Sequence, residues 1–89
     1  MKIIPINVAG DCRQSGLERI KASQISKILG FKPNISDDPS KVVNSWGFSV
    51  DGENYGIWDY KGSHRYGCFS TFGSPDVFKK LFGDHWSKN

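Results

Sequence analysis

Apolar and polar residues alternate most clearly in the middle of the chain. Two β-prone runs, 42–50 and 55–60, flank the segment 51–54, which begins with an Asp-Gly pair. An Asp-Gly pair between two such runs is a strong signal for a β-hairpin. A further apolar run, 66–72, follows a short basic loop and predicts the third strand of an antiparallel meander.

Shorter apolar runs near the N-terminus predict two more strands. Residues 2–8 are rich in Ile and Val, and Pro5 restricts this strand to a sheet edge or a bulge. Residues 9–16, bracketed by two glycines, are expected to form a loop, and residues 17–22 a short strand. Residues 34–40 are expected to form a polar loop.

Two segments have the apolar spacing of a helix. In the first, Ser23 is expected to cap the helix and Gly30 to end it. In the second, Ser74 is the expected cap, Pro75 occupies the first helical position, and Gly83 ends the helix. The apolar faces are formed by Ile25, Ile28 and Leu29 in the first helix and by Phe78, Leu81 and Phe82 in the second.

These elements predict a single α+β domain over residues 1–89, with two short helices on one face of a mostly antiparallel sheet and a tail, 84–89, that can fray. Aromatic residues make up 13% of the chain, so large rings carry much of the small core that this length allows. Twelve Lys and Arg against nine Asp and Glu give a net charge of +3, far below that of a histone-like protein.

The N-terminal segment lacks the features of an export signal. Its short apolar run is broken by Pro5, and no small-residue cleavage site follows. No stretch approaches the roughly 20 apolar residues of a membrane span. Without an export signal, Cys12 and Cys68 are expected to be reduced thiols, and the expected compartment is the cytoplasm.

The predicted hairpin has two different faces, because side chains alternate along a strand. With a turn of two or four residues, the bulky face that meets the helices carries Val42, Asn44, Trp46, Phe48, Val50, Tyr55, Ile57 and Asp59. The opposite face carries Val43, Ser45, Gly47, Ser49, Asn54, Gly56, Trp58 and Tyr60. Only a three-residue turn would break this division.

The second face is a candidate ligand-binding face. Its floor of small residues leaves the backbone open to close approach, and the rings beside it can stack on a planar group. The basic loop 61–65 begins at its end and can bind an anionic group. The expected ligand-binding residues are Ser45, Gly47, Gly56, Trp58, Tyr60, Lys61, His64 and Arg65. Two structural alternatives are that Trp58 and Tyr60 only cover the glycines by cross-strand packing, or that a second copy of the chain buries this face.

Other residues give weaker signals for chemistry. Cys12, His64, Cys68 and His85 lack the close ligand pairs of a zinc site, so we expect no metal and no cofactor. A Cys–His catalytic pair could be drawn from Cys12 and either histidine, but a surface Cys12 and a Cys68 buried between aromatic neighbours are the simpler interpretation. Asp59 lies on the predicted inner face, where it is expected to pair with a cation such as Lys41 or to accept backbone hydrogen bonds.

The order of several motifs resembles a family of small, mostly uncharacterised proteins of bacteriophages and prophages. The resemblance covers about residues 16–82 and rests on a Gly-x-x-x-Ile-x-Ala-Ser start, a helix ending Leu-Gly-x-x-Pro, and a hairpin reading Trp-x-Phe, Asp-Gly and Ile-Trp-Asp-Tyr-Lys. Where relatives carry a Trp-His-Ile-Gly-Gly-like strand, residues 68–73 read Cys-Phe-Ser-Thr-Phe-Gly, so no role of that histidine is carried over.

The resemblance implies a phage accessory protein that acts against host defence in the host cytoplasm. Together with the aromatic and basic face, it leads to the hypothesis of a non-enzymatic protein that sequesters an anionic nucleotide signal. The alternatives are an inhibitor that docks on a host defence protein, such as a nuclease or CRISPR complex, and a small nucleic-acid-binding module. A homo-oligomer is compatible with each of these, and an enzyme fits least well.

Overall fold

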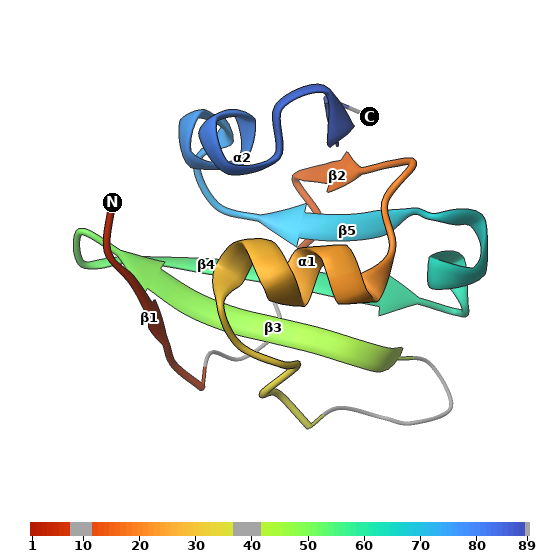
Figure 1. The fold of residues 1–89 in the computed structure, drawn as a ribbon, viewed down its shortest axis with the longest axis horizontal. Helices are drawn as coiled ribbons and strands as arrows, with labels where there is room; N and C mark the ends of the chain where they lie inside the picture. The colour runs from red at the N-terminus through yellow and green to blue at the C-terminus, as the bar shows by residue number, and fades with distance from the viewer. Residues whose placement is uncertain (8–11, 37–41, 89) are drawn as a thin grey trace.

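A computed structural model describes residues 1–7, 12–36 and 42–88. In these residues the chain forms one six-stranded antiparallel sheet and two α-helices, an α+β fold as predicted (Figure 1). The strands are β1 (Ile3–Pro5), β2 (Ser15–Leu17), β3 (Val42–Val50), β4 (Glu53–Tyr60), β5 (Phe69–Phe72) and β6 (Trp86–Ser87). The α-helices are α1 (Ala22–Leu29) and α2 (Pro75–Phe82), and two 3₁₀ turns are η1 (Ser63–Tyr66) and η2 (Gly83–His85).

The predicted meander forms the centre of the sheet, whose strand order is β1-β3-β4-β5-β2-β6. Asp51 and Gly52 form the two-residue turn between β3 and β4, and their φ angles are 52° and 82°. Positive φ at both central positions is what a type I′ turn requires, and this turn matches the twist of the strands it joins. Pro5 lies in β1 at the edge of the sheet, opposite Phe48. This position agrees with the prediction, because proline has no N–H to donate to a second neighbouring strand.

Several element boundaries differ from the predictions. Ser15 and Gly16 belong to β2 rather than to a loop, because they pair with β5. The strand predicted over 17–22 therefore begins and ends earlier. Helix α1 begins at Ala22, and its N-cap is Lys21 rather than Ser23; the Lys21 N–H donates to Gln24 Oε1 over 2.8 Å. Gly30 ends this helix at φ 91°, as predicted.

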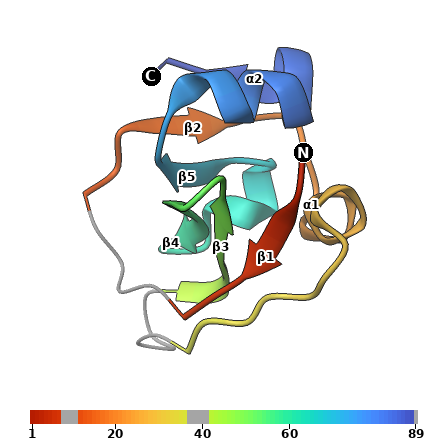
Figure 2. The ribbon, with the colours of Figure 1, turned by 90° about the vertical axis from the view of Figure 1, so that its left-hand side faces the viewer.

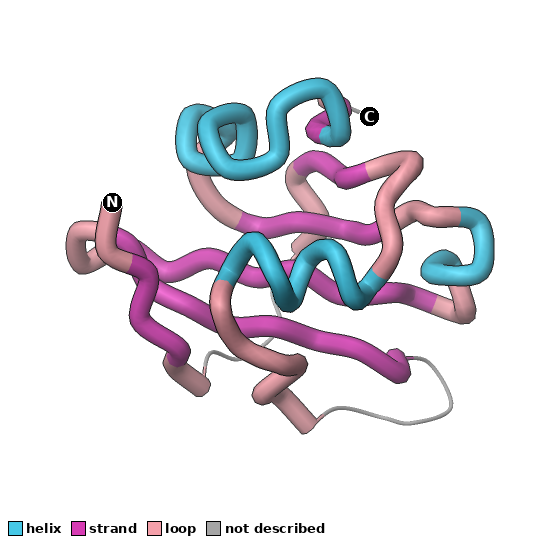
Figure 3. The backbone as a smooth tube through the Cα atoms, in the orientation of Figure 1, coloured by secondary structure: helices cyan, strands magenta, loops and turns pink. Residues whose placement is uncertain are grey.

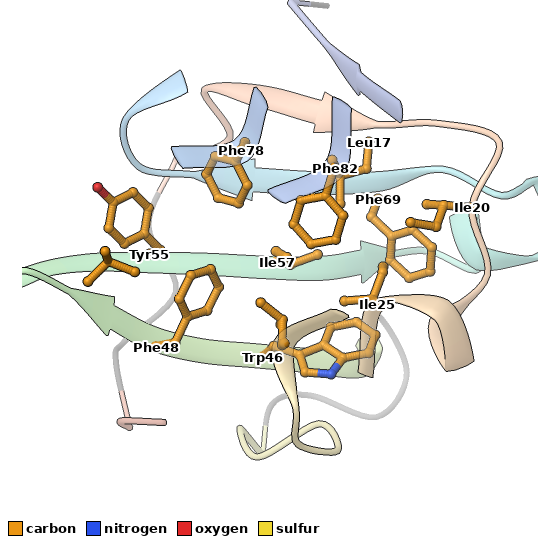
Figure 4. Packing of buried hydrophobic residues seen from close by; sticks show 12 residues of the cluster. Leu17, Ile20, Ile25, Trp46, Phe48, Tyr55, Ile57, Phe69, Phe78 and Phe82 are labelled. Atoms are coloured by element: carbon orange, nitrogen blue, oxygen red, sulfur yellow. The ribbon is translucent and has the colours of Figure 1, made fainter. Parts of the chain in front are cut away.

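The core lies between the meander and the two helices. Helix α1 crosses in front of β3 and β4 in Figure 1, and Figure 2 shows it end-on to one side of them. Its inward side chains are Ile25 and Leu29, while Ile28 is 38% exposed, so the predicted three-residue stripe was too wide. The rings of the core pack mostly edge to face or stacked. Figure 4 shows this cluster, including Trp46, Phe48, Tyr55, Ile57, Phe69, Phe78 and Phe82.

The C-terminal segment forms an element that we did not predict. Trp86 and Ser87 form β6, which pairs with β2. The Trp86 ring packs against the core, its Nε1–H donates to Ser15 Oγ over 3.0 Å, and Lys79 Nζ lies 4.8 Å from the ring centroid. Strand β6 is therefore the edge strand of the sheet on the side opposite β1.

Candidate ligand surface

The division of the hairpin into two faces holds where Ser45–Val50 pairs with Glu53–Trp58, but the register shift between Val42 and Ser45 pairs Val42 with Tyr60, which we had assigned to opposite faces. Trp46, Phe48 and Ile57 are fully buried on the face that meets the helices. Trp58 is half-buried and Tyr60 is exposed, and neither ring belongs to the core cluster. The rings that we assigned to the outer face therefore lie outside the core.

The floor of the outer face is more covered than we expected. Ser45, Gly47 and Gly56 are all buried. A Cβ added to Gly56 would lie 3.7 Å from Cζ3 of Trp58, so the indole ring lies over this glycine. An aromatic ring placed over a glycine is a common way to stabilise a strand that the glycine weakens. The space above Gly56, in which we expected a ligand, is thus occupied by Trp58.

The basic loop lies at the end of the sheet far from the hairpin turn, where Figure 3 shows η1 between β4 and β5. Lys61 and Gly62 both have positive φ, 52° and 78°, and reverse the chain after β4. Lys61 Nζ lies 5.3 Å from the centroid of the exposed Tyr60 ring. Arg65 is exposed, and its guanidinium carbon lies 3.7 Å from the position of a Cβ at Gly62. Cations and an aromatic ring therefore share this end of the molecule.

Tyr66 extends this surface and was missing from the predicted site. We expected Tyr66 to begin the third strand, but β5 begins at Phe69 and Tyr66 belongs to η1. The turn is closed by hydrogen bonds from Gly67 N to His64 O and from Cys68 N to Ser63 O, both 3.1 Å long. As a result Tyr66 is 83% exposed. The signal in the sequence was the pair of glycines, 62 and 67, on either side of the turn.

The acidic residue on the inner face is joined to this loop. Asp59 is fully buried, and its Oδ1 accepts the N–H groups of Val43 and Asn44 over 2.8 Å each. Its Oδ2 accepts Asn44 Nδ2 over 2.9 Å and lies 2.8 Å from Nδ1 of His64. The pairing of β3 with β4 shifts between Val42 and Ser45, which leaves these backbone N–H groups for the carboxylate.

The expected backbone hydrogen bonds of Asp59 are therefore confirmed. The other expected partner, Lys41, lies outside the described residues. Histidine 64 is the partner that we did not expect. The contact with His64 has the length of an ion pair but not the alignment of a directed hydrogen bond.

The remaining candidate chemistry is spread over the surface. Both cysteines are exposed and neither forms a disulfide, so the expectation of a buried Cys68 was wrong. His85 lies far from the loop in sequence, and its Nδ1 contacts the carbonyl oxygen of Glu18 at 3.1 Å. In residues 1–7, 12–36 and 42–88, no group of three His, Cys, Asp or Glu side chains could hold a metal ion.

Comparisons with known proteins give no match: no family model, no curated protein and no solved structure is significantly similar to this chain. Within the described part of the chain, no helix has the length and apolar character needed to cross a membrane. The function is therefore inferred from the site itself.

Proposed function

We propose that this protein binds an anionic, nucleotide-type ligand without turning it over. The proposed site is the surface formed by Tyr60, Lys61, His64, Arg65 and Tyr66, called here the β4–η1 surface. The observation that carries the proposal is that two exposed tyrosines, 45% and 83% exposed, precede and follow two cations within residues 60–66 of the chain.

The chemistry of this surface suits a nucleotide. Stacking of a base on an aromatic ring contributes about 1–3 kcal/mol per base, and Lys or Arg forms charge-assisted hydrogen bonds with phosphate. Residues 60–68 contain no Asp or Glu, so no carboxylate of this segment opposes an anion. The nearest acid in the sequence, Asp59, is fully buried and accepts three hydrogen bonds.

Trp58 belongs to the same proposal in a supporting role. Its half-buried ring covers Gly56 and leaves the exposed tyrosines as the stacking groups. Ser45, Gly47 and Gly56 then support the strands beneath the site rather than contact the ligand. The proposed site is therefore smaller than the predicted one and consists of the β4–η1 surface alone.

The biological role that we propose follows from the resemblance to phage proteins. The protein would act in the cytoplasm of a host cell and would sequester a nucleotide signal of the host's defence, as a monomer or a homo-oligomer. No catalytic step is part of this role. The two alternative functions, docking on a host protein and binding of single-stranded nucleic acid, would give different results in the experiments described next.

Isothermal titration calorimetry against cyclic mononucleotides, cyclic dinucleotides and short linear oligonucleotides tests the proposal. We expect at least one of them to bind, and Tyr66→Ala to weaken it about 5- to 150-fold, the equivalent of one lost stacking interaction. Lys61→Ala removes a cation of the β4–η1 surface. Its matched control is Lys27→Ala, because Lys27 is also an exposed lysine but belongs to α1. Only the Lys61 variant should lose affinity.

Silence of the whole panel would overturn the proposal. Binding of oligonucleotides alone, with no mononucleotide or dinucleotide bound and with an affinity that falls steeply with salt, would instead favour the nucleic-acid-binding module. Retention of a host protein that is lost with Tyr66→Ala, with no nucleotide bound, would favour the protein inhibitor.

A further inference from the structure

We infer that His64 makes the β4–η1 surface selective for ribonucleotides, because its Nε2 accepts a hydrogen bond from a ribose 2′-hydroxyl. In this inference Asp59 is the positioning residue that sets the orientation of the His64 ring. The inference rests on the proposed function and deepens it, since it names the chemical class of the nucleotide.

The first step is the position of the proton on His64. The Asp59 carboxylate is held by three hydrogen-bond donors from Val43 and Asn44. A carboxylate oxygen only accepts, so in the inferred arrangement the ring nitrogen 2.8 Å from Oδ2 carries the proton, although this contact is not aligned as a directed hydrogen bond. That nitrogen is Nδ1, and in the neutral imidazole the other nitrogen, Nε2, then has a lone pair and accepts.

The second step is the direction in which Nε2 is available. Nδ1 is buried, yet the His64 side chain as a whole is 28% exposed, so its exposed area lies on the rest of the side chain. Among the described residues, none donates a hydrogen bond to Nε2. The Nδ1 edge of the ring thus lies against the buried carboxylate, and the exposed area belongs to the rest of the side chain.

The third step is the contrast between this acceptor and its neighbours. Lys61 and Arg65, on either side of His64 in the sequence, have only donors to offer and suit phosphate oxygens. A hydrogen-bond acceptor within a few residues of two such cations suits a group that donates and lies close to a phosphate. In nucleotides the ribose 2′-hydroxyl is such a group, and it is what distinguishes RNA from DNA at a given site.

The test compares three forms of one probe by calorimetry. The probes are a short oligouridylate, its 2′-deoxy form and its 2′-fluoro form. The fluoro form keeps a ribose-like sugar pucker but cannot donate. We expect the ribose form to bind about two- to tenfold more tightly than both others for each ribose that is contacted, which corresponds to one hydrogen bond.

Two variants of His64 separate its two nitrogens. In His64→Asn the amide can still donate to Asp59, but no acceptor remains at the place of Nε2, so we expect the preference for ribose to disappear. In His64→Gln the longer side chain places an amide oxygen near that position, so we expect part of the preference to return. Lys61→Ala should weaken all three probes by the same factor, because phosphate is common to them.

Each outcome decides the inference. Equal binding of the three probes overturns it and leaves the proposed function in place, as does a ribose preference that persists in a folded His64→Asn protein, with folding checked by circular dichroism. Failure of all three probes to bind also overturns it. The proposed function itself fails only if the wider panel of cyclic and linear nucleotides is silent as well.

Discussion

Replacing the buried carboxylate tests the polar network that joins the sheet to the β4–η1 surface. In Asp59→Asn the side chain keeps its size, but one of its two oxygens becomes an NH₂ group. If the remaining oxygen keeps the N–H groups of Val43 and Asn44, the NH₂ group faces two donors, Asn44 Nδ2 and His64 Nδ1. These donors were 2.9 and 2.8 Å from the lost oxygen.

The expected loss of stability follows from this geometry. A hydrogen bond to a charged group contributes about 1.5–3 kcal/mol, and a buried donor left without an acceptor costs about 1–3 kcal/mol. Because Asp59 is fully buried, water cannot replace the missing acceptor without a rearrangement. We expect the free energy of unfolding to fall by about 3–5 kcal/mol, the combined cost of the lost hydrogen bond and of the buried donors left without an acceptor.

Urea denaturation followed by tryptophan fluorescence measures this loss. The matched control is Asp51→Asn, which makes the same chemical change at an exposed turn position with φ 52°, a conformation that Asn readily adopts. The control should change stability by about 0.5 kcal/mol or less. A loss below about 1 kcal/mol for Asp59→Asn would refute the reasoning, because it would show that the carboxylate is not needed by its donors.

Two further predictions concern the core. Gly73→Ala should cost about 3 kcal/mol or more, because a Cβ there would overlap Cδ2 of the Tyr55 ring and φ is 124°. Gly52→Ala, whose Cβ meets nothing within 4 Å, should cost about 1 kcal/mol, the strain of its positive φ. Thermal unfolding of both variants would show the difference, and equal losses would contradict it. Burial and the neighbouring Glu53 carboxylate raise the pKa of Tyr55 above its ordinary 10.0, so the fold favours the neutral phenol. The stabilisation that the raised pKa provides is present below pH 10 and is lost as the pH rises through the raised pKa. The difference in unfolding free energy between the protein and Tyr55→Phe, measured by urea denaturation, should therefore shrink above pH 10. A difference that does not depend on pH would contradict this prediction.

The parts of the fold that could be predicted are those determined by local sequence. The Asp-Gly turn, the alternation of side chains along β3 and β4, and the glycine that ends each helix each depend on a few adjacent residues. The parts that were missed depend on distant partners. Strand β2 exists because it pairs with β5, and β6 because Trp86 packs on the core and bonds Ser15. These partners are distant in the sequence, so the pattern of neighbouring residues does not predict either strand.

The candidate site divides in the same way. Tyr60, Lys61, His64 and Arg65 are close in sequence, so their grouping could be predicted. The exposure of Tyr66 depends on η1, which replaces the expected start of a strand. The pairing of His64 with a buried carboxylate depends on the register shift in β3, which alternation alone does not indicate.

The most direct test of ligand binding at the β4–η1 surface is an NMR titration of the ¹⁵N-labelled protein with whichever nucleotide binds in calorimetry. The account predicts that the largest shifts fall on the amides of residues 60–67 and disappear in the double variant Lys61→Ala, Tyr66→Ala. Shifts centred on α1, or on the β1 edge of the sheet, would contradict it.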